Sequence, residues 1–290
     1  MADPDHSHLM IGLPGTGKTT FLAALWHVIR NHDAVPGALR LAGVRGDRTY
    51  LNRIEQQWLA CLPIERTNVA GQAVTIRIEH PAHRQAFELS IPDVSGEMYE
   101  VVQWGQRECP PDYADLAGSS SGALLFLHPD ATKETDSIVE VDRAITGLFD
   151  EASHDIEAGT ERAEPWEPRR TPTQVKLVEL LQFFLSHAPP RIRLGVIVSA
   201  WDRVDGQPTT PEDWLRRRVP LLHQFLTAND DRIVHRVYGV SAQGGSLDAA
   251  ETLREHGVAV RRIRVVDPEG ESNDITAPVR WLMTAGRGET

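Results

Sequence analysis

The sequence is poor in cysteine, and it contains no long apolar run. Two cysteines, Cys61 and Cys109, occur among 290 residues, which excludes a disulfide framework and a cluster of thiolate ligands for zinc. No apolar stretch approaches the roughly 18 residues that a membrane-spanning helix needs. The polar, acidic start also lacks the basic and apolar segments of a signal peptide. These absences predict a cytoplasmic protein without a membrane partner.

Basic residues are outnumbered, and lysine is rare among them. The chain has 41 Asp and Glu against 30 Lys and Arg, a formal net charge of −11. Such a chain is repelled by phosphate backbones, so we expect no nucleic-acid partner. Only three residues are lysines, namely Lys18, Lys133 and Lys176, and the first lies in a glycine-rich loop. A hydrophobic fraction of 41% is enough to form a buried core.

Apolar runs alternate with segments of helical periodicity along most of the chain. The predicted strands are residues 8–11, 39–42, 74–78, 87–91, 123–127, 194–198, 234–240 and 262–266. The predicted helices are residues 21–29, 47–62, 97–107, 138–149, 174–186, 211–227 with a kink at Pro220, 247–256 and 278–283. A turn at residues 80–83 predicts an antiparallel hairpin. The alternation as a whole predicts an α/β layered domain with a mainly parallel sheet.

Residues 12–19, Gly-Leu-Pro-Gly-Thr-Gly-Lys-Thr, match the phosphate-loop pattern at every position. Glycines at 15 and 17 permit positive φ, which turns successive backbone N–H groups towards a phosphate, and the next helix points its positive end at the same anion. Lys18 can bind the β- and γ-phosphates, and the Thr19 hydroxyl can complete a magnesium shell. A glycine-rich turn before a helix is the alternative, but the full match favours nucleotide binding. The candidate phosphate-binding residues are Gly12, Pro14, Gly15, Thr16, Gly17, Lys18, Thr19 and Thr20.

Further polar residues follow the ends of later predicted strands. Asp93 and Gly96 come after the strand at 87–91, where an aspartate can hold Mg²⁺ and a glycine N–H can meet a γ-phosphate. Asp202 follows the strand at 194–198, and its carboxylate could accept from N1–H and N2–H of guanine. Ser241 and Ala242 end the strand at 234–240 and could contact the guanine O6. Taken singly, each of these matches is also typical of a turn.

With its motifs in this order, the sequence resembles the translation-factor-related class of P-loop GTPases over about residues 8–245. The Gly-Lys-Thr-Thr-Phe-Leu start, the Asp-x-x-Gly-Glu and the helix at 275–282 are similar to the bacterial "double-GTPase" type of conflict-system operons. The resemblance implies a three-layer, small-GTPase-like fold with a mainly parallel six-stranded sheet, in one domain over residues 1–290. Within it we expect a mobile acidic insertion at 151–172, which has few apolar residues, and a C-terminal extension packed on the core at 246–290.

The resemblance also implies GTP or GDP and Mg²⁺ as ligands, with roles assigned by position. Lys18 would bind phosphate, Thr19 and Asp93 would serve the metal, Gly96 would sense the γ-phosphate, and Asp202 would read guanine.

One further role remains to be assigned, and the sequence differs from the usual GTPase motifs at two places. Thr67, ahead of the hairpin, is the candidate for the mobile-loop threonine that joins the metal, with an ordinary loop threonine as the alternative. Glu97 stands where many such GTPases use Gln to orient water, and its added negative charge predicts slow hydrolysis. Ser199 and Ala200 replace the Asn or Thr and the Lys of the base-reading motif, so Trp201 is either a stacking replacement or a core residue.

The sequence therefore predicts a GTP-binding protein with slow Mg-dependent hydrolysis. GTP-dependent ordering near Thr67 and at 93–97 would act as a switch towards a protein effector or operon partner, in a bacterial defence system. One alternative is a P-loop ATPase or nucleotide kinase, in which Asp93 binds the metal and Asp202 is a turn residue. The other is a scaffold that binds nucleotide without hydrolysing it.

Overall fold

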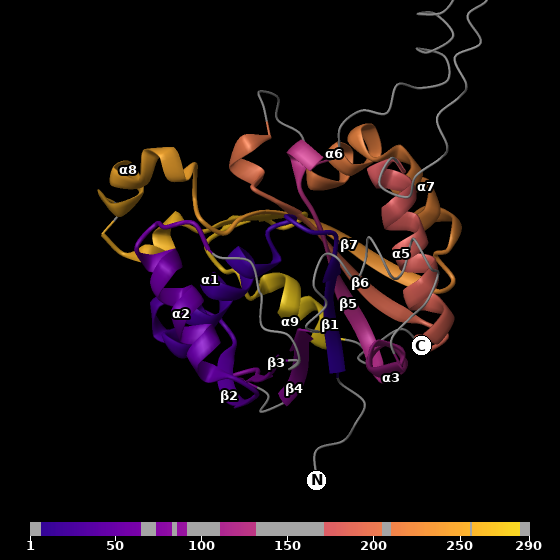
Figure 1. The fold of residues 1–290 in the computed structure, drawn as a ribbon, viewed down its shortest axis with the longest axis horizontal. Coiled ribbons are helices and arrows are strands. Elements are labelled where there is room, and N and C mark those ends of the chain that lie inside the picture. Colours follow the sequence, from indigo (N-terminus) through magenta and orange to yellow (C-terminus); the bar gives the residue numbers. More distant parts are fainter. Residues whose placement is uncertain are drawn as a thin grey trace, which may run out of the picture.

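One sheet with helices on both of its faces makes up the structure, which is a computed structural model (Figure 1). It describes residues 7–64, 74–82, 86–91, 111–131, 171–204, 210–255 and 257–284. The helices predicted at 97–107 and 138–149 lie outside the described residues, as does all but the end of the insertion predicted at 151–172.

Within the described residues, the sheet has nine strands in the order β2-β3-β4-β1-β5-β6-β7-β8-β9. Their bounds are β1 (Ser7–Gly12), β2 (Arg40–Arg45), β3 (Val74–Glu79), β4 (Ala86–Ile91), β5 (Ser120–Leu127), β6 (Ile192–Ser199), β7 (Ile233–Ser241), β8 (Arg264–Asp267) and β9 (Gly270–Ser272). The central strands from β4 to β7 pair in parallel, and every pair outside them is antiparallel. The α/β class is confirmed, but the prediction of a mainly parallel six-stranded sheet is wrong, because the described sheet is larger and mixed.

Short connections explain two of the antiparallel pairs, β3 with β4 and β8 with β9. The hairpin predicted around residues 80–83 is confirmed, with Val74 opposite Ile91 and Glu79 opposite Ala86. Parallel pairing needs a crossover of a dozen or more residues, which this connection and the Pro268-Glu269 turn between β8 and β9 are too short to provide. The predicted strands at 39–42 and 262–266 correspond to β2 and β8, which extend the sheet on either side.

The described helices cover both faces of the sheet. Their bounds are α1 (Lys18–Arg30), α2 (Arg48–Leu59), α3 (Pro111–Gly118), α5 (Thr173–His187), α6 (Pro211–Arg218), α7 (Pro220–Ala228), α8 (Ala250–Glu255) and α9 (Ala277–Met283). The single helix predicted at 211–227 is two helices, because Val219 leaves the helical conformation (φ −133°, ψ 54°) just before Pro220, which has no N–H to donate. None of the described helices has the length and apolar character that crossing a bilayer requires.

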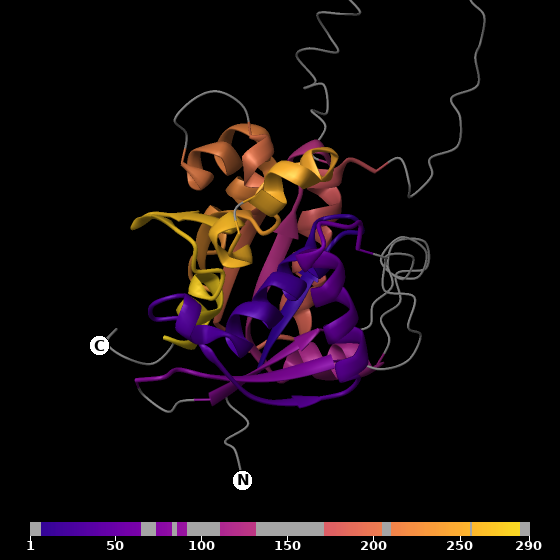
Figure 2. The same ribbon diagram turned by 90° about the vertical axis from the view of Figure 1, so that its left-hand side faces the viewer.

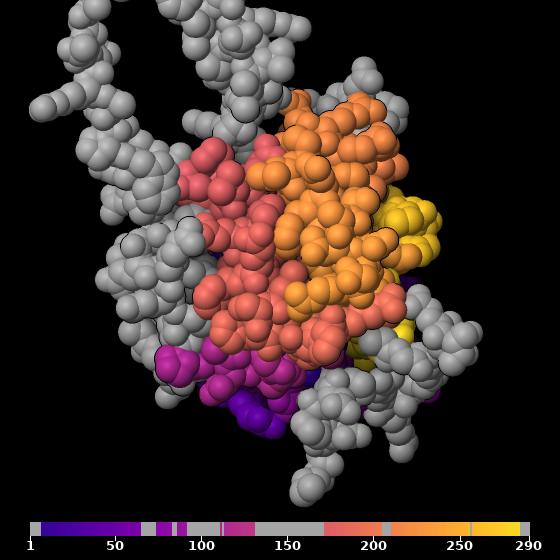
Figure 3. Space-filling model, turned by 90° about the vertical axis from the view of Figure 1, so that its right-hand side faces the viewer, coloured from indigo at the N-terminus to yellow at the C-terminus, as the bar shows by residue number. Residues whose placement is uncertain are grey.

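Two buried clusters hold the layers together. One joins α1, α2 and α9 to a face of the sheet and includes Phe21 and Trp58. Figure 2 shows α1 and α2 in front of the sheet on that side. The other joins α3, α5, α6 and α7 to the opposite face and includes Leu181 and Phe184, and Figure 3 shows α5 beside α6 and α7 there. A central parallel strand is therefore apolar on both faces, as in β6, where Val196 and Ile197 are both fully buried.

Parallel pairing also brings four strand ends together. Gly12, Leu127, Ser199 and Ser241 end β1, β5, β6 and β7, which are adjacent and run in the same direction. In open α/β sheets, ligands bind in the crevice outside the carboxyl ends of such strands. This edge is therefore where a site is expected.

Candidate nucleotide-binding site

The loop between β1 and α1 has the backbone that its glycines predict. Gly12, Gly15 and Gly17 have φ of +144°, +73° and +85°, a region that other residues rarely enter. A Cβ at Gly12 would lie 2.7 Å from the carbonyl oxygen of Phe126, and one at Gly17 would lie 3.0 Å from the Ser199 hydroxyl. Conformation and close packing thus both require glycine at 12 and 17, while the space beside Gly15 is open. The predicted strand, loop and helix are confirmed.

Lys18, the first residue of α1, folds back over this loop. Its Nζ donates to the carbonyl oxygens of Gly12 and Leu13, each at 2.7 Å. Burial lowers the pKa of Lys18 to about 8. The two hydrogen bonds leave the ammonium inside the loop, where phosphate oxygens would compete with carbonyl oxygens for it.

The remaining loop residues divide into those that support the loop and those near its opening. Thr16 is buried, and its hydroxyl donates to the carbonyl oxygen of Leu13 at 2.8 Å, so it stabilises the loop from within. Pro14, Thr19 and Thr20 are partly exposed, and Thr20 lines the cavity described next. Thr19 thus has the exposure that a magnesium ligand needs.

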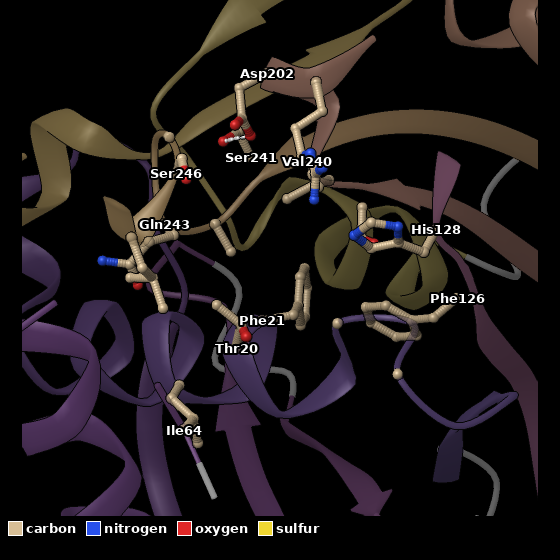
Figure 4. A pocket seen from close by; sticks show the side chains of 18 of the residues that line it. Thr20, Phe21, Ile64, Phe126, His128, Asp202, Val240, Ser241, Gln243 and Ser246 are labelled. Carbon is tan, nitrogen blue, oxygen red and sulfur yellow. Dashed lines mark hydrogen bonds between the residues drawn. The ribbon is translucent and has the colours of Figure 1, made fainter. Parts of the chain in front are cut away.

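A cavity of about 390 Å³ lies between this loop and the ends of β5, β6 and β7 (Figure 4). It brings the phosphate loop and the predicted base-reading residues to one place, since Gly15, Gly17 and Thr20 line it together with Asp202 and Ser241. In Figure 4, Asp202 and Ser241 lie across the cavity from Thr20 and Phe21. The other lining residues are Phe21, Leu62, Ile64, Phe126, His128, Ile197, Ser199, Ala200, Arg203, Val240, Ala242, Gln243, Gly245, Ser246, Leu247 and Asp248.

Asp202 is held at the cavity by its neighbours. Ala200 has φ +45°, a left-handed conformation that is rare for a residue with a Cβ, and it turns the chain from β6 into the short helix Trp201–Arg203. The Ser241 hydroxyl donates to Oδ1 of Asp202, and the Gly244 N–H donates to the Ser241 hydroxyl at 3.2 Å. The carboxylate is therefore oriented by β7 although Asp202 itself is exposed.

Trp201 is a core residue, and the alternative that it stacks on a ligand is wrong. Its side chain is only 6% exposed and does not line the cavity. Gly239 makes room for the indole, since a Cβ there would lie 2.3 Å from the ring. The ring packs against Trp214 with centroids 6.5 Å apart.

Ser199 ends β6 with a buried hydroxyl. Its hydroxyl is buried and has no hydrogen bond to any part of the chain that the structure describes, yet the residue lines the cavity beside Gly17. Leaving such a group unsatisfied costs about 1–3 kcal/mol, so a bound ligand that bonded to it would recover this free energy.

Sequence reasoning missed several cavity residues. Leu62 and Ile64 line the cavity from the segment after α2, and no motif marks them. His128 lines it from the end of β5, and burial lowers the pKa of this histidine while Asp130 opposes the shift. Near it, Arg203 forms an ion pair of 2.8 Å with Asp130.

Most of the predicted metal and switch residues belong to segments that the structure does not describe. Thr67, Asp93, Gly96 and Glu97 lie outside the described residues. Within the described ranges, no group of three His, Cys, Asp or Glu side chains is placed to hold a metal ion. Thr19 is thus the predicted magnesium ligand that the structure describes.

The chain was compared with solved structures, with curated proteins and with models of protein families. Among solved structures, the chain is similar to sup35 complexed with GDP, with 13% identity and a TM-score of 0.35. The match covers 83% of this chain and 38% of the sup35 chain. It is also similar to the signal recognition particle receptor SRb-GTP/SRX complex from Chaetomium thermophilum, with 14% identity and a TM-score of 0.37. This match covers 87% of this chain and 97% of the other. No curated protein matches the chain. The sequence model of Double-GTPase 1 matches residues 9–282, most of the chain.

The match to Double-GTPase 1 includes the phosphate loop and every described residue of the predicted base-reading set. Membership of a GTPase family supports GTP binding by this chain. The chain belongs to the Double-GTPase 1 family.

Proposed function

We propose that the cavity binds Mg·GTP, with the polyphosphate in the loop at 12–19 and the purine at Asp202. The observation that carries this proposal is that both sets of residues open onto the same cavity of about 390 Å³. The loop supplies backbone N–H groups and the charge of Lys18 at one end. At the other end, Asp202 supplies an oriented carboxylate.

Guanine is the base that this carboxylate fits. Guanine offers two adjacent donors, N1–H and N2–H, whereas adenine has an acceptor at N1. An unpaired carboxylate facing an acceptor is unfavourable, so Asp202 discriminates against adenine. The backbone N–H groups of Ser241 and Ala242 are proposed to meet the guanine O6.

The chemistry at the phosphate end rests on residues both inside and outside the described ranges. Thr19, with Asp93 and Thr67, is proposed to hold Mg²⁺, which neutralises charge on the β- and γ-phosphate oxygens when bound. Glu97 is proposed to orient the attacking water, at a slow rate because its negative charge faces an anion. Gly96 is proposed to sense the γ-phosphate.

The switch role and its setting follow from the same resemblance. GTP-dependent ordering near Thr67 and at 93–97 would change a surface offered to a protein effector or operon partner in the cytoplasm, as part of bacterial defence. We also propose that residues 1–290 form one domain with a mobile insertion at 151–172 and a packed extension at 246–290. The pairing of β8 with β7 and the burial of Leu282 in α9 support the packed extension.

Two measurements on the purified chain test the proposal. Calorimetric titration with GTP and with ATP in Mg²⁺ is expected to give at least about tenfold tighter binding of GTP, because only guanine pairs with the carboxylate. Single-turnover chromatography is expected to show GDP forming well below about 1 per second. Lys18→Met is the control and should lose affinity for both nucleotides.

Other outcomes would identify the alternatives. Equal or tighter binding of ATP would favour the ATPase or nucleotide kinase interpretation and contradict the role of Asp202. Stoichiometric recovery of GTP after prolonged incubation would favour the non-hydrolysing scaffold. No binding of either nucleotide would reject the proposal as a whole.

A further inference from the structure

The loop that follows β7 is supported by residues distant in sequence. We call residues 241–245, Ser-Ala-Gln-Gly-Gly, the base loop. Nε1 of Trp58 donates to the carbonyl oxygen of Ala242 at 2.9 Å, and Nε2 of Gln243 donates to the carbonyl oxygen of Trp58 at 3.4 Å. At Gly244, a Cβ would lie 2.4 Å from the carbonyl oxygen of Arg262. The base loop is thus packed between the last turn of α2 and Arg262.

Trp58 and Arg262 also contact each other. Trp58 is fully buried and Arg262 is 6% exposed. The Arg262 guanidinium lies 4.7 Å from the centroid of the Trp58 ring, and its Nη2 donates to the Trp58 carbonyl oxygen at 3.0 Å. Such a cation–π contact is strongest when it is desolvated. The two side chains and the base loop therefore form one packed unit.

The same turn of α2 leads into another wall of the cavity. Cys61, which accepts a hydrogen bond from Nη1 of Arg262 at 2.6 Å, has φ +53° and lies in the turn that follows α2. Leu62 and Ile64 follow it and line the cavity. Two parts of the cavity wall, the base loop and this segment, are consequently fixed to Trp58 and Arg262.

We propose that Trp58 and Arg262 are positioning residues for base recognition. Neither lines the cavity, so each acts through the base loop, by holding Ser241 where its hydroxyl orients Asp202. This inference rests on the proposed function, and it deepens it by naming what sets guanine selectivity. A shift of the base loop would loosen Asp202 and weaken contacts to the 2-amino group of guanine first.

The chain offers a matched control for this role. Trp58→Phe removes one indole N–H and leaves an aromatic ring in place. Trp26, 2% exposed, donates through Nε1 to Oδ1 of Asn52 at 3.2 Å between α1 and α2 and does not line the cavity. Trp26→Phe therefore removes a comparable hydrogen bond in the same layer without touching the base loop.

The experiment compares affinities for GTP and for inosine triphosphate, which lacks the 2-amino group, and the rate of GDP release. Trp58→Phe is expected to lower the preference for GTP about 2- to 10-fold, the range of one hydrogen bond, and to speed GDP release by a similar factor. Trp26→Phe is expected to keep the preference for GTP and the rate of GDP release within about twofold of the parent protein. This holds even if its Tm falls as far as that of Trp58→Phe. Arg262→Lys, which keeps the charge but loses the planar contact with the indole, is expected to follow Trp58→Phe and serves as the second variant if that one does not fold.

The outcomes separate this inference from the proposed function. If the parent protein prefers GTP while Trp58→Phe and Arg262→Lys keep that preference, the positioning role is overturned and the proposed function stands. A fall in Tm without a change in preference also overturns the positioning role, because a purely structural role predicts it. If the parent protein binds neither nucleotide, the proposed function itself is overturned.

Discussion

The protonation of Lys18 gives a prediction whose size comes from the structure. Burial lowers the pKa of Lys18 from an ordinary value of 10.5 to about 8 in the folded protein without nucleotide. A difference of this size corresponds to about 3 kcal/mol against the charged form. A neutral amine still has two hydrogens, enough to donate to both loop carbonyls, so losing the proton need not break the loop.

The sign of the effect follows from counting protons. Between pH 8 and pH 10.5 the unfolded chain binds a proton at Lys18 that the folded chain has released, so stability rises with pH through this window. The destabilising effect is present in full below pH 8 and is absent above pH 10.5. Relative to Lys18→Met, the free energy of unfolding of the parent protein should rise by about 2 kcal/mol between about pH 7.5 and about pH 9.5.

Urea denaturation of the parent protein and of Lys18→Met at these two pH values measures their free energies of unfolding. The difference between the two proteins removes the contribution of other titrating groups. Bound nucleotide should raise the pKa of Lys18 again, because the phosphate favours the charged form of its amine. At about pH 9 we therefore expect uptake of about one proton on binding, seen by calorimetry in buffers of different ionisation enthalpy. A stability difference that is flat or falls with pH would refute the account of Lys18.

Two further predictions concern the same end of the cavity. Gly12→Ala should lower the free energy of unfolding, measured by urea denaturation, by about 3 kcal/mol or more, because its Cβ would meet the Phe126 carbonyl oxygen at 2.7 Å. Gly15→Ala, where the space is open, should lower it by about 1 kcal/mol through backbone strain alone, and equal losses in the two variants would contradict the packing described. Ser199→Ala should raise the free energy of unfolding of the nucleotide-free protein by about 1 kcal/mol, because it removes a buried hydroxyl that lacks a partner among the described residues, and a loss of stability would show that the hydroxyl is bonded.

The sequence was sufficient for those parts of the site where each residue type is required locally. Gly12 and Gly17 have positive φ and neighbours that exclude a side chain, so the loop could be predicted from its pattern. Asp202 and Ser241 could be paired because they follow strands of one parallel sheet, whose ends converge. The hydrogen bond between them shows that the two side chains lie together at this edge of the sheet.

The rest depended on tertiary contacts that leave no periodic signal. β9 consists of three exposed residues, so nothing apolar marked it, and its pairing with β8 enlarged the sheet beyond the predicted one. Trp58 reads as an ordinary apolar position of α2, while its partner Ala242 lies 184 residues away. The helix predicted at 47–62 included Leu62, but α2 ends at Leu59 and Leu62 lies at the cavity.

The central claim is that Asp202 chooses the purine, and exchanging the base tests it most directly. Xanthine carries an oxygen in place of the 2-amino group of guanine, so an amide at position 202 can donate where the carboxylate accepted. The affinities of Asp202→Asn and of the parent protein for GTP and xanthosine triphosphate should show a reversed preference, with a combined change on the order of 100-fold. If both proteins bind GTP equally well and neither gains xanthosine triphosphate, Asp202 does not read the base.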